Sequence, residues 1–365
     1  MRLVSVVSAR PNFVKLAAIQ HAIEADTSKS FEHVIVHTGQ HYDPLFSDVF
    51  FEQLKIPLPT HNLEVHGGDR DEVIARTEEK FFELLPTLKP DCVLVYGDVN
   101  GAVGAAQASK KYGTKLAHVE AGLRSFDESM PEELNRVRID ELADFLFCTE
   151  ESGMDHLAEE KAKGEIFLVG NTMIDTLIRM MPLIEKEKLP DTIPEKFGVV
   201  TIHRPSNVDN EEALWSVTSF LSDVSERCPL IFPMHHRFKN SISHFASIEE
   251  LSPDGHIKFL EPFPYLQFLK LVQRAQFILT DSGGIQEEAT YLKKKCFTLR
   301  RNTERPSTIE SGSNTLIDEM LEADQEKVFS FAAHPVTPTV NVPPLGDGKA
   351  GERNRPPFRL VKQGK

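Results

Sequence analysis

Residues 277–289 read Phe-Ile-Leu-Thr-Asp-Ser-Gly-Gly-Ile-Gln-Glu-Glu-Ala. The first four residues predict a buried parallel strand, and the small residues that follow predict a turn that opens a helix. Ser282, Gly283 and Gly284 leave room for a phosphate, and the first N–H groups of a helix are unpaired and lie at its positive dipole end. We therefore expect a nucleotide diphosphate here, with Glu288 accepting hydrogen bonds from ribose hydroxyls. An ordinary strand-to-helix turn is the alternative.

Length and composition predict a soluble protein with two hydrophobic cores. The chain has 365 residues, of which 40% are hydrophobic and 26% are charged, as is typical of globular proteins. The 55 acidic side chains outnumber the 41 lysines and arginines and give a formal net charge of −14. Such a surface does not attract nucleic acid or an anionic membrane, so any phosphate must be bound by a local site.

The cysteines and the N-terminus predict a cytoplasmic protein. Cys92, Cys148, Cys228 and Cys296 are far apart and form no Cys-x-x-Cys motif, which indicates buried thiols rather than a metal site or a disulfide framework. The apolar run in residues 1–8 is too short for a signal sequence. No run approaches the roughly eighteen apolar residues of a membrane span.

Short β-rich runs alternate with helical patterns along the chain, which predicts an α/β fold with parallel sheets. The strands predicted in the first half are 3–7, 33–37, 92–96, 117–119, 145–148 and 166–169. Those predicted in the second half are 199–202, 230–234, 257–260, 277–280 and 296–299. Residues 71–88 predict a helix with one apolar face. The segment from Ala333 is rich in proline and predicts no long final helix.

Charged residues follow the predicted strands of the first half. In parallel sheets, ligands bind beyond the carboxyl ends of the strands. Arg10 and Lys15 follow the first strand and suit an anionic leaving group, with solvated surface charge as the alternative. Asp98 follows the third predicted strand, Glu120 follows the fourth, and Glu132 lies in the loop beyond it, so we expect the three carboxylates on one edge of the sheet. Neighbouring carboxylates there acquire the different pKa values that an acid and a base require. The alternative for Asp98 is a helix cap, and the alternative for Glu120 and Glu132 is an ion pair with Arg124 or Arg136.

The second half repeats this arrangement with histidines. His203 and His235 follow its first two strands and suit phosphate binding or acid catalysis, although structural histidines are equally compatible with the pattern. No His-Cys or His-x-x-x-His spacing indicates zinc. The chain has no Gly-x-Gly-x-x-Gly after its first strand and no Walker loop, so neither a dinucleotide redox cofactor nor ATP is indicated.

Several motifs occur together in one order along nearly the whole chain. They are Ala9-Arg10-Pro11, Thr38-Gly39-Gln40-His41, His118 to Arg124, Pro131-Glu132-Glu133, Gly170-Asn171-Thr172, His203-Arg204, Asp281 to Glu288, Thr303-Glu304-Arg305-Pro306 and Gly346 to Ala350. In these motifs the chain resembles the non-hydrolysing UDP-N-acetylglucosamine 2-epimerases. The resemblance implies reversible conversion of UDP-GlcNAc to UDP-ManNAc in polysaccharide biosynthesis by a homodimer, with no metal or other cofactor.

The same resemblance implies an architecture and a set of site residues. It implies two Rossmann-like domains of the glycosyltransferase-B architecture that face each other across a cleft. Residues 1–170 would carry the catalytic carboxylates, residues 171–350 would bind UDP, and residues from about 350 to 365 would return to the first domain. The catalytic positions are Arg10, Lys15, Asp98, Glu120, Glu132 and His203. The UDP positions are Phe268, Ser282, Gly283, Gly284, Glu288 and Arg305, and Gln40 and His41 match a second UDP-GlcNAc site that activates bacterial relatives.

The residue types suit this chemistry independently. The C2 hydrogen of the sugar is unactivated, but expelling UDP from C1 makes its removal feasible and gives 2-acetamidoglucal. Protonation on the other face and return of UDP then give the epimer, which requires a base, an opposed acid and cations at the diphosphate. The residues do not decide which carboxylate is the base.

Departures from the family pattern leave other substrates open. Asn12 and Ser206 stand where relatives commonly have Glu, Val99 stands where they have Thr, and Pro356 and Pro357 interrupt the place of the last helix. A 2-epimerase of a UDP-2,3-diacetamido uronic acid is the first alternative, and a hydrolysing epimerase that releases ManNAc is the second. A glycosyltransferase of the same architecture and a non-catalytic nucleotide-sugar sensor are alternatives from other classes.

Overall fold

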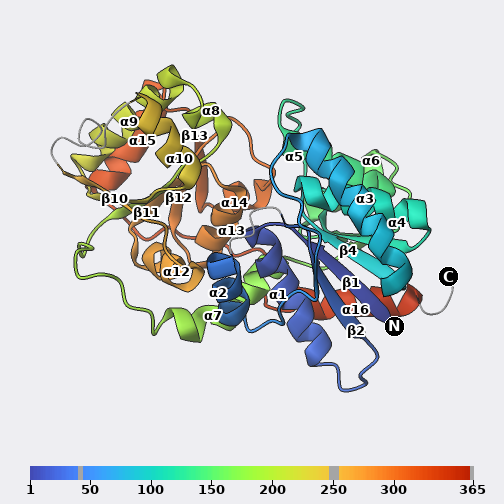
Figure 1. Cartoon of the computed structure of the whole chain (residues 1–365). Coiled ribbons are helices and arrows are strands. Elements are labelled where there is room, and N and C mark those ends of the chain that lie inside the picture. The colour runs from blue at the N-terminus through green and yellow to red at the C-terminus, as the bar shows by residue number, and fades with distance from the viewer. Residues whose placement is uncertain (40–43, 246–254, 362–365) are drawn as a thin grey trace. The chain divides into compact units, whose positions relative to one another are not determined.

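The chain divides into two compact α/β units in a computed structural model that describes residues 1–39, 44–245 and 255–361. Unit 1 comprises Met1–Arg179 and Pro344–Lys365, and unit 2 comprises Met180–Pro343 (Figure 1). Each unit contains a parallel sheet, so the predicted α/β fold of two parallel-sheet units is confirmed. Among the described residues, no helix is long and apolar enough to cross a membrane.

Unit 1 is a parallel seven-stranded sheet in the order β3-β2-β1-β4-β5-β6-β7. The strands are β1 (Arg2–Val7), β2 (Glu32–His37), β3 (His61–Asn62), β4 (Cys92–Tyr96), β5 (Lys115–Ala121), β6 (Phe145–Cys148) and β7 (Glu165–Leu168). The helices are α1 (Arg10–Glu24), α2 (Pro44–Leu54), α3 (Arg70–Leu88), α4 (Asn100–Tyr112), α5 (Pro131–Leu142), α6 (Glu151–Glu159), α7 (Thr172–Ile184) and α16 (Ala350–Val361). The last residues of α7 belong to unit 2.

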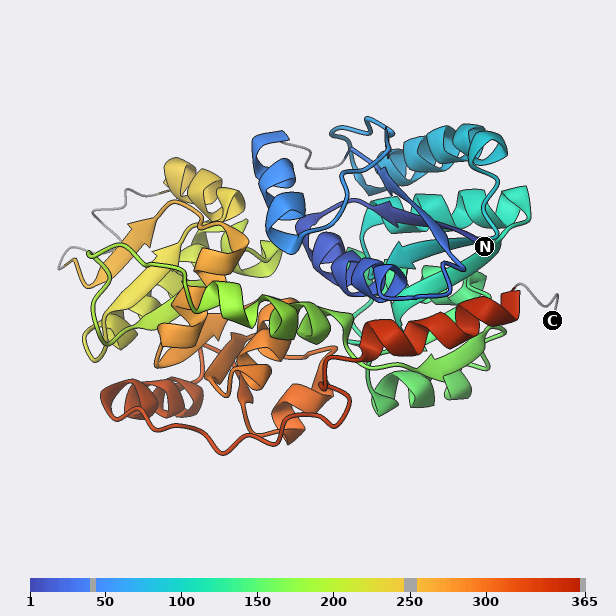
Figure 2. The same ribbon diagram turned by 90° about the horizontal axis from the view of Figure 1, so that it is seen from below.

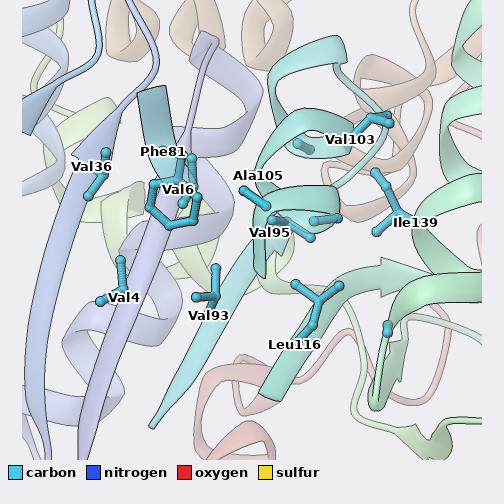
Figure 3. Close-up of a cluster of buried hydrophobic side chains, with 14 of the residues drawn as sticks. Val4, Val6, Val36, Phe81, Val93, Val95, Val103, Ala105, Leu116 and Ile139 are labelled. Atoms are coloured by element: carbon cyan, nitrogen blue, oxygen red, sulfur yellow. The ribbon is translucent and has the colours of Figure 1, made fainter. Parts of the chain in front are cut away.

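One face of this sheet is covered by α3, α4 and α5. Valines of β1, β2 and β4 point toward Phe81 of α3, Val103 and Ala105 of α4, and Ile139 of α5 (Figure 3). The helical stripe predicted for residues 71–88 is confirmed, because Val73, Ile74, Thr77, Phe81, Leu85 and Leu88 are buried. This apolar layer holds the carboxyl ends of the strands in fixed positions, which is what a site at that edge requires.

The expectation that the chain ends without a long helix is wrong. α16 forms over Ala350–Val361 and lies beside α1 (Figure 2). Gly351 makes the close approach possible, since a side chain there would collide with the Ala18 carbonyl. Proline disfavours a helix because it has no backbone N–H to donate, and the prediction rested on prolines such as Pro356 and Pro357. Packing against α1 stabilises the helix despite that loss.

Unit 2 is a parallel six-stranded sheet in the order β10-β9-β8-β11-β12-β13. The strands are β8 (Gly198–Thr201), β9 (Leu230–Pro233), β10 (Ile257–Leu260), β11 (Phe277–Thr280), β12 (Lys295–Leu299) and β13 (Asn314–Ile317). The helices are α8 (Pro205–Val208), α9 (Glu211–Ser225), α10 (His236–Phe245), α12 (Tyr265–Arg274), α13 (Gly283–Tyr291), α14 (Pro306–Glu310) and α15 (Glu322–Ala333). The sequence reasoning missed β3 and β13, which are short and lack an apolar run.

Both sheets have the strand order of a doubly wound nucleotide-binding fold. The order reverses between β1 and β4 in unit 1 and between β8 and β11 in unit 2. The helices that follow the two central strands lie on opposite faces, which opens a crevice beyond the carboxyl ends of those strands. The loops after these four strands are therefore the positions to examine for function.

Candidate active site

Asn12 joins the two loops that border the crevice of unit 1. Its Oδ1 accepts hydrogen bonds from the backbone N–H groups of Ser8 at 3.1 Å and Ala9 at 3.2 Å. Its Nδ2 donates to the carbonyl of Tyr96, at the end of β4, at 2.9 Å. A glutamate, expected here from the resemblance, could accept but not donate. The departure at Asn12 therefore belongs to the support of the loops, and its side chain is buried.

A buried ion pair lies at the same edge of the sheet. Lys15 Nζ is 2.6 Å from Glu120 Oε1, and each residue is 5% exposed. Gly97 makes room for this pair at φ +60°, because a Cβ there would lie 2.8 Å from the ammonium nitrogen. Glu120 itself has φ +78°, at a shift in the register of β5 against β6. A non-glycine residue in this conformation is strained, and such strain is concentrated at functional sites.

Asp98 and Glu132 are connected to this edge through α5. Asp98 accepts a hydrogen bond from Arg136 at 2.5 Å, and the N-cap of α4 is the following residue, Val99. Glu132 is half-buried in the first turn of α5. The neighbouring Glu133 is buried and accepts a hydrogen bond from Arg136 at 2.9 Å. Two consecutive carboxylates thus have different environments, and only the second is deeply buried.

Arg124 belongs to a separate buried network. It contacts Asp140 at 2.7 Å and Glu160 at 2.7 Å, which differ from the partners Glu120 and Glu132 considered for it from the sequence. Asp140 also lies 2.6 Å from the ring of buried His118. Burial raises the pKa of Asp140, but the neighbouring His118 and Arg124 outweigh it and leave the pKa below its ordinary value. This network supports the turn after β5.

The remaining predicted site residues of unit 1 are Arg10 and the two residues expected at the activator site. Arg10 opens α1 and is exposed, with its guanidinium carbon 5.6 Å from the ring centroid of Phe50. Gln40 and His41 lie outside the described residues.

In unit 2, residues 277–289 form the predicted strand, turn and helix. β11 ends at Thr280, and α13 begins at Gly283 with Ser282 as its N-cap. Ser282, Gly283 and Gly284 are partly exposed, and the Ser282 side chain makes no capping hydrogen bond to the helix. A Cβ at Gly283 would clash with Glu304 Oε1, so glycine leaves room here for the Glu304 carboxylate. The N-terminus of α13 is suited to a phosphate.

Asp281 holds the opposite side of this crevice. Its buried carboxylate accepts hydrogen bonds from the backbone N–H groups of His203 at 3.0 Å and Arg204 at 2.8 Å, and from Asn207 Nδ2 at 3.0 Å. The His203 ring is about one-third exposed, and its Nδ1 lies 3.3 Å from Asp281 Oδ1. Asp281 was missed as a site residue, although its place directly after a buried strand was the available signal. It fixes the loop after β8 to the loop after β11.

Glu288 is more buried than a ribose-binding carboxylate needs to be. It is 2% exposed and accepts a hydrogen bond from the Tyr265 hydroxyl at 3.0 Å. Burial raises the pKa of Glu288 to about 7, although the hydrogen bond from Tyr265 opposes the rise. The protonation of Glu288 therefore changes within the physiological range.

The remaining UDP candidates frame α13. Arg305 is buried, with Nε 3.1 Å from Glu287 Oε1. Phe268 of α12 is half-buried against the apolar layer beneath α12 and α13. Gln286 of α13 accepts a hydrogen bond from Thr303 at 2.7 Å, which ties the loop after β12 to the helix. His203, Ser282, Glu288 and Arg305 all belong to this one unit, whereas Lys15, Asp98, Glu120 and Glu132 belong to the other.

The described residues contain no group of three or more His, Cys, Asp or Glu side chains arranged to hold a metal ion. In both units, the loops at the carboxyl ends of the strands contain small residues, carboxylates and cations. A family model described as UDP-N-acetylglucosamine 2-epimerase matches residues 23–354, which is most of the chain. The chain belongs to the UDP-N-acetylglucosamine 2-epimerase family. The resemblance of the motifs to this family is confirmed, and the chain is an enzyme of the isomerase class.

Relatives within the UDP-N-acetylglucosamine 2-epimerase family have two kinds of name. A UDP-N-acetylglucosamine 2-epimerase of Methanocaldococcus jannaschii is 37% identical over 363 residues, covering 97% of both chains. A UDP-2,3-diacetamido-2,3-dideoxy-D-glucuronate 2-epimerase of Pseudomonas aeruginosa is 35% identical over 323 residues, covering 87% of this chain and 88% of that one. A crystal structure of the Methanocaldococcus jannaschii UDP-GlcNAc 2-epimerase in complex with UDP-GlcNAc and UDP covers 100% of both chains, with a TM-score of 0.90 and 36% identity. The expected glycosyltransferase-B type of fold is confirmed by this match.

Proposed function

We propose that this enzyme interconverts UDP-GlcNAc and UDP-ManNAc by inverting C2, without hydrolysing the nucleotide sugar. The observation that carries the proposal is the buried pair of Lys15 and Glu120, which stands at the edge of the unit 1 sheet on a strained residue. A purely structural ion pair has no need of strain at its carboxylate, whereas a reacting carboxylate benefits from a fixed position. The relative crystallised with UDP-GlcNAc and UDP supports the choice of substrate.

The proposal gives the two units different tasks. Unit 2 binds UDP, with the diphosphate at the N-terminus of α13, and Phe268, Glu288 and Arg305 are assigned to the same nucleotide. Unit 1 acts on the sugar through Asp98, Glu120 and Glu132. Arg10 and Lys15 stabilise the negative charge that develops on the departing UDP, and His203 is the residue of unit 2 assigned to the reaction.

The reaction proceeds by elimination and addition. A carboxylate takes the proton from C2 while the C1–O bond breaks, and the bonding electrons leave with UDP. The resulting 2-acetamidoglucal has a double bond between C1 and C2. A proton is then delivered to the opposite face of C2, and an oxygen of UDP re-forms the bond to C1. These reaction steps are redox-neutral, so they need no redox cofactor. We propose that the enzyme uses no metal either.

The resemblance extends the proposal beyond the reaction. We propose that the enzyme is a cytoplasmic homodimer that supplies polysaccharide biosynthesis. Gln40 and His41 are assigned to a second UDP-GlcNAc site that activates the enzyme.

A second substrate is supported by the Pseudomonas aeruginosa relative. That protein is named for a UDP-2,3-diacetamido uronic acid, and it is only slightly less similar to this chain than the UDP-GlcNAc 2-epimerase of Methanocaldococcus jannaschii. Both sugars carry an acetamido group on the C2 that is inverted, so the same carboxylates would serve either. They differ at C3, which carries a hydroxyl or an acetamido group, and at C6, which is a hydroxymethyl or a carboxylate.

Product analysis decides between these substrates. The enzyme is incubated separately with UDP-GlcNAc and with UDP-2,3-diacetamido-2,3-dideoxyglucuronate, and the nucleotide sugars are separated by anion-exchange chromatography. UDP-ManNAc formed from the first compound supports the proposal. Turnover of the second compound alone selects the alternative substrate, and free ManNAc with UDP selects hydrolysis.

A further inference from the structure

The first two turns of α5 hold the loops around the candidate carboxylates of unit 1. Glu133 is 4% exposed and accepts hydrogen bonds from the backbone N–H and the hydroxyl of Ser125, both at 2.9 Å. Its other oxygen accepts from the backbone N–H of Phe126 at 3.1 Å. Phe126 has φ +57° and is 73% exposed, and its ring lies edge-on to that of His156 with the ring centroids 5.1 Å apart. The Glu133 carboxylate holds the loop between β5 and α5 in a strained shape.

Arg136 connects that loop to Asp98. One arm of its buried guanidinium contacts Glu133 at 2.9 Å, and the other contacts Asp98 at 2.5 Å. A planar guanidinium with donors on both sides can bridge two carboxylates at a fixed separation, which an ammonium cannot do. The preceding residue adds a third connection, since Asn135 Nδ2 donates to the backbone carbonyl of Asp98 at 2.8 Å.

We infer that Arg136 is a positioning residue for Asp98, and that Glu133 is the support of Arg136 and of the loop leading to Glu132. The inference rests on the proposed function, in which Asp98 and Glu132 act on the sugar. It gives the two consecutive glutamates different roles. Glu132 is the one assigned to the reaction, and Glu133 acts through Arg136.

The charges around Asp98 come from four elements. Arg136 and Glu133 face it from α5, and Arg70 of α3 reaches the region through a 3.0 Å hydrogen bond to Asn135. Lys15 of α1 and Glu120 of β5 lie beside the preceding residue, Gly97. Arg136 contacts Asp98 directly, so removing it takes away a positive charge that favours the ionised carboxylate.

The test is a double-mutant cycle on C2 epimerisation of UDP-GlcNAc. Its proteins are the wild type, Arg136→Gln, Asp98→Asn and the double variant. Arg138→Gln is the matched control, because Arg138 lies on the same helix in an exposed 2.9 Å pair with Glu141. We expect Arg136→Gln to lower kcat about 100-fold with a change in KM of less than about threefold, since misplacement of a reacting group affects mainly the chemical step. The control keeps the wild-type kcat.

Three results identify positioning rather than general support. The double variant is about as slow as Asp98→Asn alone, because Arg136 acts through Asp98. In Arg136→Gln, the limb of the kcat/KM profile that Asp98 controls moves upward by about one pH unit. Arg136→Lys recovers part of kcat, because it restores the charge without the two-armed contact.

Other results overturn the inference. It is wrong if Arg136→Gln behaves like Arg138→Gln, or if the losses in the double variant multiply. If Arg136→Gln does not fold, full activity in a folded Arg136→Lys also overturns it. A wild type that does not turn over UDP-GlcNAc contradicts the proposed function instead. In that case the contact between Arg136 and Asp98 is tested by urea unfolding of the wild type, Arg136→Lys, Asp98→Asn and the double variant. If the losses in free energy of unfolding of the two single variants add up in the double variant, the inference is overturned.

Discussion

At the scale of single residues, the candidate chemistry of unit 1 depends on backbone conformations that most side chains avoid. Gly97 at φ +60° leaves room for the Lys15 ammonium, and Glu120 at φ +78° presents its carboxylate to that ammonium. Bringing two charged groups out of water is costly unless they are paired, and this pair is 2.6 Å apart. The strained backbone and the buried charges are therefore parts of one arrangement.

Replacing Gly97 with alanine tests that arrangement. The new methyl group would lie 2.8 Å from Lys15 Nζ and 3.4 Å from Glu120 Oε1, so the ammonium must move away from its partner. We expect Gly97→Ala to lower kcat at least tenfold, as expected when a reacting group is displaced. Gly113→Ala is the control, because it has φ +87° but no atom within 4 Å of the new Cβ. Steady-state assays of both variants would contradict the account if they lost activity equally.

The raised pKa of Glu288 predicts a pH dependence of stability. Its pKa is about 7 in the folded protein against an ordinary value of 4.5, so the folded state keeps a proton that the unfolded state has lost. Stability therefore falls as the pH rises from about 4.5 to about 7. Glu288→Gln removes this dependence. Its free energy of unfolding relative to that of the wild type should therefore be about 3 kcal/mol higher at pH 8 than at pH 4. Urea unfolding at both pH values measures it, with exposed Glu310→Gln as the control, and parallel profiles of wild type and Glu288→Gln would refute it.

At the scale of elements, loops rather than strands decide the site. The apolar runs in β1, β4, β8 and β11 predicted the sheets, and the rule of strand ends then predicted that Asp98 and Glu120 share an edge. The partners of these side chains were not predictable, because a hydrogen bond of about 3 Å depends on how the whole loop packs. Asp281, Arg136 and Asn12 were thus overlooked as loop supports. β13 was missed because Asn314–Ile317 has no apolar run, and α16 was missed because tertiary packing outweighed its prolines.

Asp281 predicts a specific loss at the β8–α8 loop. An alanine there would remove the carboxylate oxygen that accepts hydrogen bonds from the two backbone N–H groups and from Asn207, leaving buried donors unsatisfied. We expect Asp281→Ala to destabilise unit 2 by about 2–4 kcal/mol and to weaken UDP binding. The only tryptophan of the chain, Trp215, lies in α9 of this unit, so its fluorescence in urea measures the loss. Wild-type stability with wild-type UDP affinity would show that Asp281 has no supporting role.

At the scale of the whole molecule, the chain builds the same topology twice and then returns to its first unit. Both sheets reverse their strand order between two central strands, and each crevice has its own polar loops. Pro344–Lys365 belongs to unit 1, and α16 packs on α1, the helix that carries Arg10 and Lys15. The end of the chain thus supports the unit that is assigned to sugar chemistry.

Ending the chain after Pro343 separates the two units in an unfolding experiment. Loss of α16 exposes buried side chains of α1, so unit 1 should lose several kcal/mol, as when a packed helix is removed from a core. Unit 2 keeps all of its elements, and the Trp215 fluorescence transition should stay near that of the wild type. Far-ultraviolet circular dichroism then shows an earlier transition than fluorescence. Coincident, unshifted transitions in both signals would contradict the role assigned to α16.

The central claim is that C2 loses its hydrogen as a proton while UDP leaves C1 and returns. Incubation with UDP-GlcNAc in D₂O, followed by proton NMR, tests it most directly. The account predicts that UDP-ManNAc appears with deuterium at C2 and that the C2 proton of the remaining UDP-GlcNAc is progressively lost. UDP-ManNAc that retains its original C2 proton, or free ManNAc as the only product, would contradict it.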